Sequence, residues 1–215
     1  MKRWTALVFL LCSACFAQAT PVFVMEFSNP SLIPARWSLE IRPDGSGHFH
    51  SVRGDAPRVP GQMIEAANQD RDVRVSPLFA ERIFDLARRK KLFQVDCESH
   101  LKVAFQGTKR LAYTGPDGVG ACEFNYSKDP DIQNLGESLG SVATTLIEGA
   151  RLQALLVHDR LGLDRETEVL AESAADGRAL QIGSIRDILK QLADDDAVME
   201  RVRRRARALL ARAED

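Results

Sequence analysis

Two histidines, His48 and His50, alternate along one predicted strand and are the clearest candidates for chemistry in the sequence. Successive side chains of a strand point to opposite faces, so residues two apart point the same way. Imidazoles at this spacing could bind zinc or copper if neighbouring strands supplied further ligands. Because the spacing shows only two such ligands, we expect an exposed polar patch of Glu40, His48 and His50, and no metal ion or other cofactor.

The turn at 43–45, with the sequence Pro-Asp-Gly, decides which face the histidines share. A type I turn followed by a left-handed glycine pairs Arg42 with Ser46. Glu40 then lies opposite His48, where its charge would raise the pKa of the imidazole. The other pairs of this register are Ile41 with Gly47, Leu39 with Phe49, and Ser38 with His50. A two-residue loop would instead bury both imidazoles without partners, and that cost favours the first register.

A G-x-S-x-G pattern, known from serine hydrolases, occurs at 136–140. In those enzymes the serine lies on a strained turn between a strand and a helix. No apolar strand precedes the pattern here, and Leu139 belongs to the apolar face of a predicted helix. We therefore expect Ser138 in mid-helix and no catalytic residue. The small Gly136 and Gly140 would allow close approach of the sheet or of another helix.

The predicted last helix, 197–213, is basic and amphipathic. Its apolar face consists of Val198, Val202, Ala206, Leu209 and Ala213. Arg201, Arg204 and Arg205 form a candidate surface for an envelope protein or an anionic surface. The alternative is the solvated face of a packed helix, since cations are favourable near a helix C-terminus. The chain carries 29 Lys and Arg against 30 Asp and Glu, which argues against nucleic acid as a partner.

Residues 1–19 have the features of a signal peptide. A basic N-terminus precedes an apolar run at 4–16, and the small-x-small sequence at 17–19 suits cleavage before Thr20. The expected location is periplasmic or secreted, with lipid anchoring at Cys15 as the alternative. Since no apolar run reaches the ~20 residues of a spanning helix, we expect no transmembrane span.

Two of the four cysteines, Cys97 and Cys122, lie beyond this leader. An even number of cysteines in an oxidising compartment favours a disulfide. The alternative, a redox or metal-binding thiolate pair, normally has C-x-x-C spacing, which is absent. We therefore predict a disulfide bond between Cys97 and Cys122.

The first half of the chain has the alternating pattern of strands, and the second half has helical periodicity. Strands are expected at 22–27, 37–42, around the two histidines, and at 70–75, 101–105, 109–114 and 121–126. Residues 54–69 are expected to form a long surface loop, and Ser76 to cap a helix that reaches about Lys91. Turns are expected at 106–108 and 115–118.

The change of period falls near Asp129, which with Pro130 begins a long helix toward Val157. Later boundaries are expected at Gly162, at Asp164 as a cap, at Gly177, and at 194–196 as the start of the last helix. The fold class is α+β, with a small antiparallel sheet and one packed helix, followed by a long helix and a C-terminal helical arm. Residues 20–128 form the sheet-and-helix part, and residues 129–215 the helical region packed on the sheet.

The order of these segments resembles uncharacterised bacterial exported proteins. The resemblance rests on WSLEIRPDGSGHFHS, a capped helix ending in LFQVD, then HLKVAFQGTKRLAYTG and CEFNYS, and it covers most of residues 22–160. It implies the exported compartment and no particular activity.

These features predict a non-enzymatic binding or interaction module of the cell envelope. The sequence shows no Gly-rich phosphate loop, no paired C-x-x-C motif and no H-E-x-x-H helix. The alternative is an unrecognised envelope hydrolase, in which Ser138 would work with His100 or His158.

Overall fold

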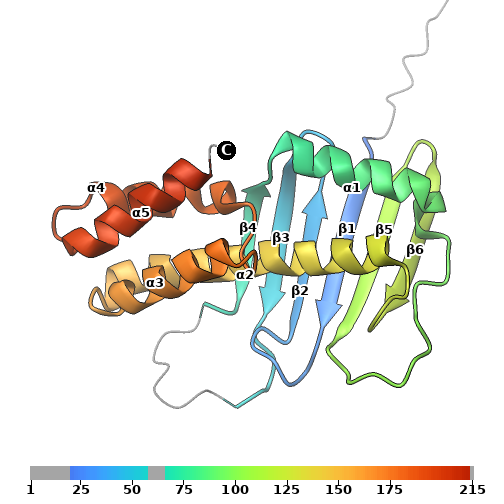
Figure 1. Cartoon of the computed structure of the whole chain (residues 1–215), viewed down its shortest axis with the longest axis horizontal. Helices are drawn as coiled ribbons and strands as arrows, with labels where there is room; N and C mark the ends of the chain where they lie inside the picture. The colour runs from blue at the N-terminus through green and yellow to red at the C-terminus, as the bar shows by residue number, and fades with distance from the viewer. Residues whose placement is uncertain (1–19, 58–65, 214–215) are drawn as a thin grey trace, which may run out of the picture.

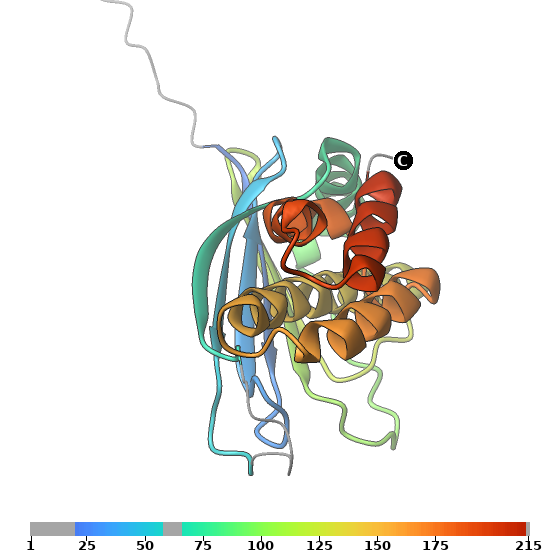
Figure 2. The ribbon, with the colours of Figure 1, turned by 90° about the vertical axis from the view of Figure 1, so that its left-hand side faces the viewer.

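The structure, a computed structural model, describes residues 20–57 and 66–213. The predicted signal peptide, with Cys15, and the middle of the predicted loop at 54–69 lie outside the described residues. The fold is α+β, as expected. An antiparallel sheet and a set of helices form two layers (Figures 1 and 2).

The sheet has six antiparallel strands in the order β4-β3-β2-β1-β5-β6. The strands are β1 (Val22–Ser28), β2 (Arg36–Ile41), β3 (Ser46–Val52), β4 (Gln69–Arg74), β5 (Thr108–Gly115) and β6 (Gly118–Phe124). The first strand therefore lies in the middle of the sheet, between β2 and β5.

The helices lie on one face of the sheet, and none of the described helices covers the other face (Figure 2). They are α1 (Pro77–Arg89), α2 (Pro130–His158), α3 (Gly162–Ala175), α4 (Arg186–Asp194) and α5 (Glu200–Arg212), with two short 3₁₀ helices, η1 (Lys91–Phe93) and η2 (Ile182–Ile185). Helices α1 and α2 cross the sheet, while α3, α4 and α5 gather beyond the edge strand β4 (Figure 1). Helices α1 and α2 therefore cover the sheet, as expected of the packed helix and of the long helix that follows it.

Side-chain caps fix the starts of the two helices that cover the sheet. Ser76 Oγ accepts a hydrogen bond from the Phe79 amide, and proline follows Ser76 at the first helical position. The Asp129 carboxylate accepts from the amides of Asp131 and Ile132 in the same way. Both caps satisfy amide groups that lack helical partners, as the sequence predicts.

One continuous hydrophobic core joins the sheet to all five helices. Alternate residues of the strands point into it, and the largest fully buried side chains include Tyr113, Phe23 and Phe49. The core continues into the C-terminal helices, where Leu170 and Leu189 are also fully buried. The residues predicted to form the apolar face of the last helix are buried, except for Ala213, which is half-buried.

The predicted disulfide between Cys97 and Cys122 is present. It joins the segment after η1 to strand β6, and both cysteines are buried. The bridge ties that segment, which has no regular structure, to the edge of the sheet.

The strand expected at 101–105 is absent, and that prediction is wrong. A strand needs a free partner edge. Strand β5 already pairs with β1 on one side and with β6 on the other. Strand β6 is the edge strand on that side of the sheet, but residues 101–106 do not pair with it and are exposed. The turn expected at 106–108 leads into β5 rather than closing a hairpin.

Two predicted helix starts are also wrong. Helix α3 begins at Gly162, whose amide bonds to the Asp159 carboxylate, so Asp164 lies within the first turn instead of capping it. Helix α5 begins at Glu200, because Asp195 accepts hydrogen bonds from the amides of Ala197 and Val198 and so closes a turn between α4 and α5. In neither helix does the side chain of the residue before the first turn cap the helix, so the acidic residues nearby were no guide to where it begins.

None of the helices in the part of the chain that the structure describes has both the length and the hydropathy needed to cross a bilayer.

Candidate functional site

The β2–β3 hairpin has the predicted register. The Arg42 amide donates a hydrogen bond to the Ser46 carbonyl at 2.7 Å, and Gly45 has a φ of 80°. The observed pairs are Ile41 with Gly47, Glu40 with His48, Leu39 with Phe49, and Ser38 with His50. The two histidines therefore lie on the sheet face that no described helix covers.

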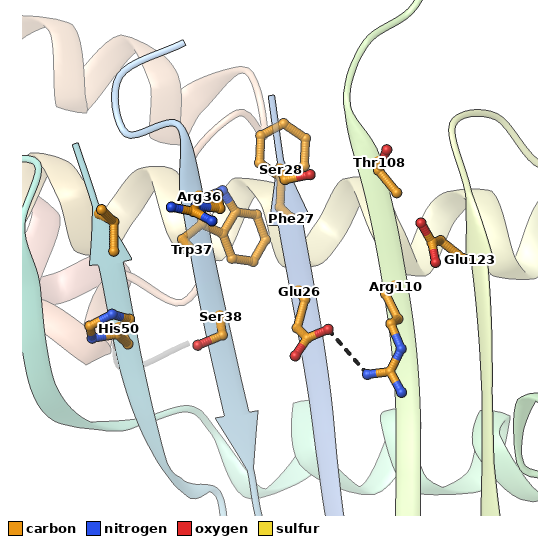
Figure 3. A pocket seen from close by; sticks show the side chains of 11 residues that line it. Glu26, Phe27, Ser28, Arg36, Trp37, Ser38, His50, Thr108, Arg110 and Glu123 are labelled. Atoms are coloured by element: carbon orange, nitrogen blue, oxygen red, sulfur yellow. Dashed lines mark hydrogen bonds and ion pairs between the residues drawn. The ribbon is translucent and has the colours of Figure 1, made fainter. Parts of the chain in front are cut away.

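A row of polar side chains crosses all six strands on this helix-free face. From β4 to β6 the row consists of Asp70, His50, Ser38, Glu26, Arg110 and Glu123. Each residue lies directly opposite the next, and such neighbours have Cβ atoms about 4.5–5.5 Å apart. Figure 3 shows the part of the row from His50 to Glu123.

His48 lies two residues along β3 from His50, on the same face of the sheet, and its imidazole contacts two carboxylates. Its Nδ1 is 3.0 Å from Asp72 Oδ1, and its Nε2 is 2.7 Å from Asp70 Oδ1. The bond to Asp72, assisted by Asp70, raises the pKa of His48 above its usual value. The prediction that Glu40 sets this pKa is wrong, because Glu40 pairs with Arg42 instead.

The row borders a groove of about 460 Å³ that is lined by residues of β1, β2, β3, β5 and β6. Four charged side chains line it. Glu26 and Arg110 form an ion pair at 3.1 Å. Arg36 and Glu123 have no ion-pair partner among the described residues. Within the described part of the chain, the groove therefore offers the unpaired Arg36 and Glu123 to a ligand that carries both signs.

Ser38, His50 and Asp70 lie next to one another on three adjacent strands. His50 Nδ1 is 3.5 Å from Asp70 Oδ2, while no hydrogen bond joins Ser38 to His50 in the described part of the chain. This order of nucleophile, base and carboxylate is that of a hydrolase triad. Sequence reasoning paired Ser38 with His50 but missed Asp70, because the pairing of β3 with β4 spans a long loop.

The G-x-S-x-G serine lies in the middle of α2, as predicted, and not on a turn after a strand. His158, in the last turn of the same helix, is roughly 30 Å from Ser138 at 1.5 Å per residue. His100 pairs with Asp96 at 2.8 Å, and no contact between Ser138 and His100 occurs among the residues the structure describes. The predicted helical context is confirmed, and these three residues do not form a site.

The two glycines of that pattern differ. A Cβ at Gly136 would lie 3.1 Å from Phe124, so this glycine does permit close approach to the sheet. Around Gly140 no heavy atom lies within 4 Å of the Cβ position. The prediction of close packing is therefore right for Gly136 and wrong for Gly140, which faces open space.

Two of the candidate arginines of α5 are engaged within the chain. Arg201 Nε lies 2.8 Å from Asp164, while Arg205 lies 2.6 Å from Asp164 and 3.0 Å from Glu168. Arg204 is exposed, and no partner for it occurs among the described residues. These contacts hold α5 against α3, and binding of a partner there stays a prediction.

The described residues contain no group of three or more His, Cys, Asp or Glu side chains arranged to hold a metal ion. No protein-family model, curated protein or solved structure matches the chain. What the molecule binds is therefore inferred from its own side chains.

Proposed function

We propose that the protein is a non-enzymatic binding module of the bacterial cell envelope, and that it holds a protein partner against the helix-free face of its sheet. One observation carries this proposal. A polar row and a groove lie on an uncovered six-stranded face, with Arg36 and Glu123 lacking ion-pair partners among the described residues. The disulfide supports an oxidising compartment, which agrees with the predicted export signal.

The charge pattern of this face favours a protein over an anionic surface. Arg110 lies between Glu26 and Glu123 in the row, and Arg36 adds a second guanidinium group to the groove. In the groove, a uniformly anionic surface would meet as many carboxylates, Glu26 and Glu123, as guanidinium groups. A polypeptide carries both charges and can match such a pattern, which gives specificity more than affinity.

Photo-cross-linking from the groove tests this proposal. A photoreactive amino acid replaces Thr108, which lines the groove, and in a second variant it replaces the exposed Glu172 on α3 as the matched control. In envelope preparations of the source organism, we expect one discrete adduct from position 108 and none from position 172. Arg36→Glu and Glu123→Lys should each abolish that adduct. The same adducts from both positions would contradict the proposal.

A hydrolase is the second candidate, and the line of Ser38, His50 and Asp70 favours it. In this case Ser38 would be the nucleophile and His50 its base, with Asp70 orienting the imidazole. Labelling by a fluorophosphonate that is lost in Ser38→Ala, with turnover of a simple ester lost in the same variant, would establish it. Ester turnover unchanged by Ser38→Ala would exclude this site.

A further inference from the structure

A second cavity lies on the other side of the sheet, between the strands and α2. Its volume is about 350 Å³, at the small end of the ~300–1,000 Å³ typical of ligand pockets. Most of its wall is apolar, and includes Phe27, Trp37, Ile33, Pro34, Ala143 and Ile147. We call this cavity the α2 cleft. It shares Phe27 and Trp37 with the groove on the helix-free face, and its other lining residues do not line the groove.

The strand register builds the floor of the α2 cleft. Phe27 lies opposite Trp37 on one side and opposite Lys109 on the other. The rings of Phe27 and Trp37 stack, with centroids 5.4 Å apart. A cation and two stacked aromatic rings therefore stand in one row beneath α2.

Two glycines one turn apart shape the roof. At Gly136 the helix touches the sheet, since a Cβ there would meet Phe124 and the Lys109 side chain at 3.1 and 3.2 Å. At Gly140, which also lines the α2 cleft, the space before the helix is open. The helix thus approaches the sheet beside Lys109 and leaves room above Phe27 and Trp37.

Lys109 is the unusual member of the α2 cleft, because only 8% of it is exposed. Its ammonium group donates to the Asn125 carbonyl at 2.9 Å and lies 5.6 Å from the centre of the Phe124 ring. An ammonium group has three donors, and no carboxylate forms an ion pair with it among the described residues. Burial lowers the pKa of Lys109. Burying an ammonium group whose remaining N–H donors lack acceptors costs free energy, unless a ligand accepts hydrogen bonds from them.

Glu137, the acidic side chain of the lining, forms no ion pair with Lys109 among the described residues. Glu137 is exposed and accepts a hydrogen bond from Gln133 Nε2 at 2.7 Å. Its carboxylate stands at the solvent side of the α2 cleft. It would repel an incoming anion weakly, so removing its charge should increase the affinity for an anionic ligand.

We propose that the α2 cleft binds a medium-chain fatty acid, with the acyl chain between Trp37 and Gly140 and the carboxylate on Lys109. The apolar walls match the chain, and the spare donors of the ammonium group match the carboxylate. Lys109, Glu137 and Gly140 line the α2 cleft and not the groove, whereas Arg36 and Glu123 line the groove and not the cleft, so either proposal can fail alone.

Trp37 serves as the reporter for dodecanoate binding. The chain has one other tryptophan, Trp4, so the full chain with Trp4→Phe reports on Trp37 only. We expect a saturable change in its fluorescence on adding dodecanoate. Gly140→Leu should abolish the change, because its side chain fills the open space, whereas Gly140→Ala should preserve it.

The head group is tested with dodecanol and two charge variants. Lys109→Met should weaken dodecanoate binding at least tenfold and leave dodecanol binding within a factor of two. Glu137→Gln should tighten dodecanoate binding and not that of dodecanol. Circular dichroism and thermal melting identify any variant that fails to fold. Tighter binding in Glu137→Gln cannot result from a failure to fold. Dodecanoate binding that persists in Gly140→Leu, or that is equal in Lys109→Met and the parent, would overturn the proposal.

Discussion

His48 lies against Asp72 across β3 and β4, with Nδ1 3.0 Å from the carboxylate oxygen. The contact couples an imidazole from the hairpin to the edge strand that follows a long loop. It therefore stabilises the pairing of β4 with the sheet in a manner that depends on the charge of the histidine.

Asp72→Asn should lower the pKa of His48 toward 6.5, the usual value for histidine. Because the folded pKa is raised, the stabilising effect of this pair is complete below about pH 6.5 and is lost as pH rises through the folded value. An NMR titration of the His48 ring protons measures the shift. Glu40→Gln is the control and should leave the titration unchanged, because Glu40 pairs with Arg42.

Glu148→Gln should stabilise the protein at pH 8 and have little effect near pH 4.5. Burial, with a hydrogen bond that the protonated Glu148 donates to the Glu166 carboxylate, raises the pKa of Glu148 to about 8. Between about pH 4.5 and 8 the folded chain therefore retains a proton that the unfolded chain has lost, and stability falls as pH rises. The gain at pH 8 should be on the order of 1–3 kcal/mol, or several degrees in Tm.

The control for Glu148 is Glu172→Gln, on the exposed side of α3. Its melting temperature should follow that of the parent at every pH. Arg151, which lies 2.8 Å from Glu166 and 3.5 Å from Glu148, remains in both variants. A pH-independent gain in Glu148→Gln would contradict the assigned pKa.

Replacing Cys97 and Cys122 by serine should lower the free energy of unfolding by about 3.5 kcal/mol, the chain-entropy value for a loop of about 26 residues. Denaturant unfolding with and without reductant measures the loss. The double variant should be insensitive to reductant. Intact-mass analysis that finds two free thiols in protein purified without reductant would contradict the bridge.

Local turn chemistry explains why the hairpin register could be predicted. A glycine after Pro43-Asp44 fixes how Arg42 and Ser46 pair, and every later pair follows by counting. Asp70 and Asp72 could not be placed in the same way. Their alignment with the histidines depends on a pairing across a long loop, for which the sequence holds no local rule.

The alternation of residues along β5 indicates that the Lys109 side chain points inward. Lys109, Leu111 and Tyr113 are two residues apart and therefore share one face of β5. Leu111 and Tyr113 are expected to point into the core, because they are apolar or aromatic. Lys109 lies on the same face of the strand and is therefore expected on the buried side as well. The segment at 101–105 has the alternating pattern of a strand, but it does not pair with β6, the edge strand on that side of the sheet.

Helices α4 and α5 should exchange their amide protons faster than α2. They gather beyond the edge strand, and the buried positions of α5 include Ala206, which buries less area than the leucines of α2 (Figure 1). Hydrogen exchange followed by mass spectrometry measures the difference. Equal protection from residue 130 to residue 213 would show that the C-terminal helices are as firmly packed as the rest.

Alanine substitutions at two glycines of α2 should change stability in opposite directions. In mid-helix, alanine is favoured over glycine by about 1 kcal/mol where space permits. Gly140 has that space, so Gly140→Ala should raise the free energy of unfolding by about this amount.

Gly149 lacks that space. A Cβ there would lie 2.3 Å from Cγ2 of Ile185, which is itself buried and only one bond from its own Cβ. The side chain cannot rotate away at low cost, and overpacking of this kind costs about 1–3 kcal/mol. Gly149→Ala should therefore destabilise despite its better helix propensity. Chemical denaturation of both variants measures the two changes, and a gain in Gly149→Ala equal to that in Gly140→Ala would mean that η2 does not pack on α2 at this position.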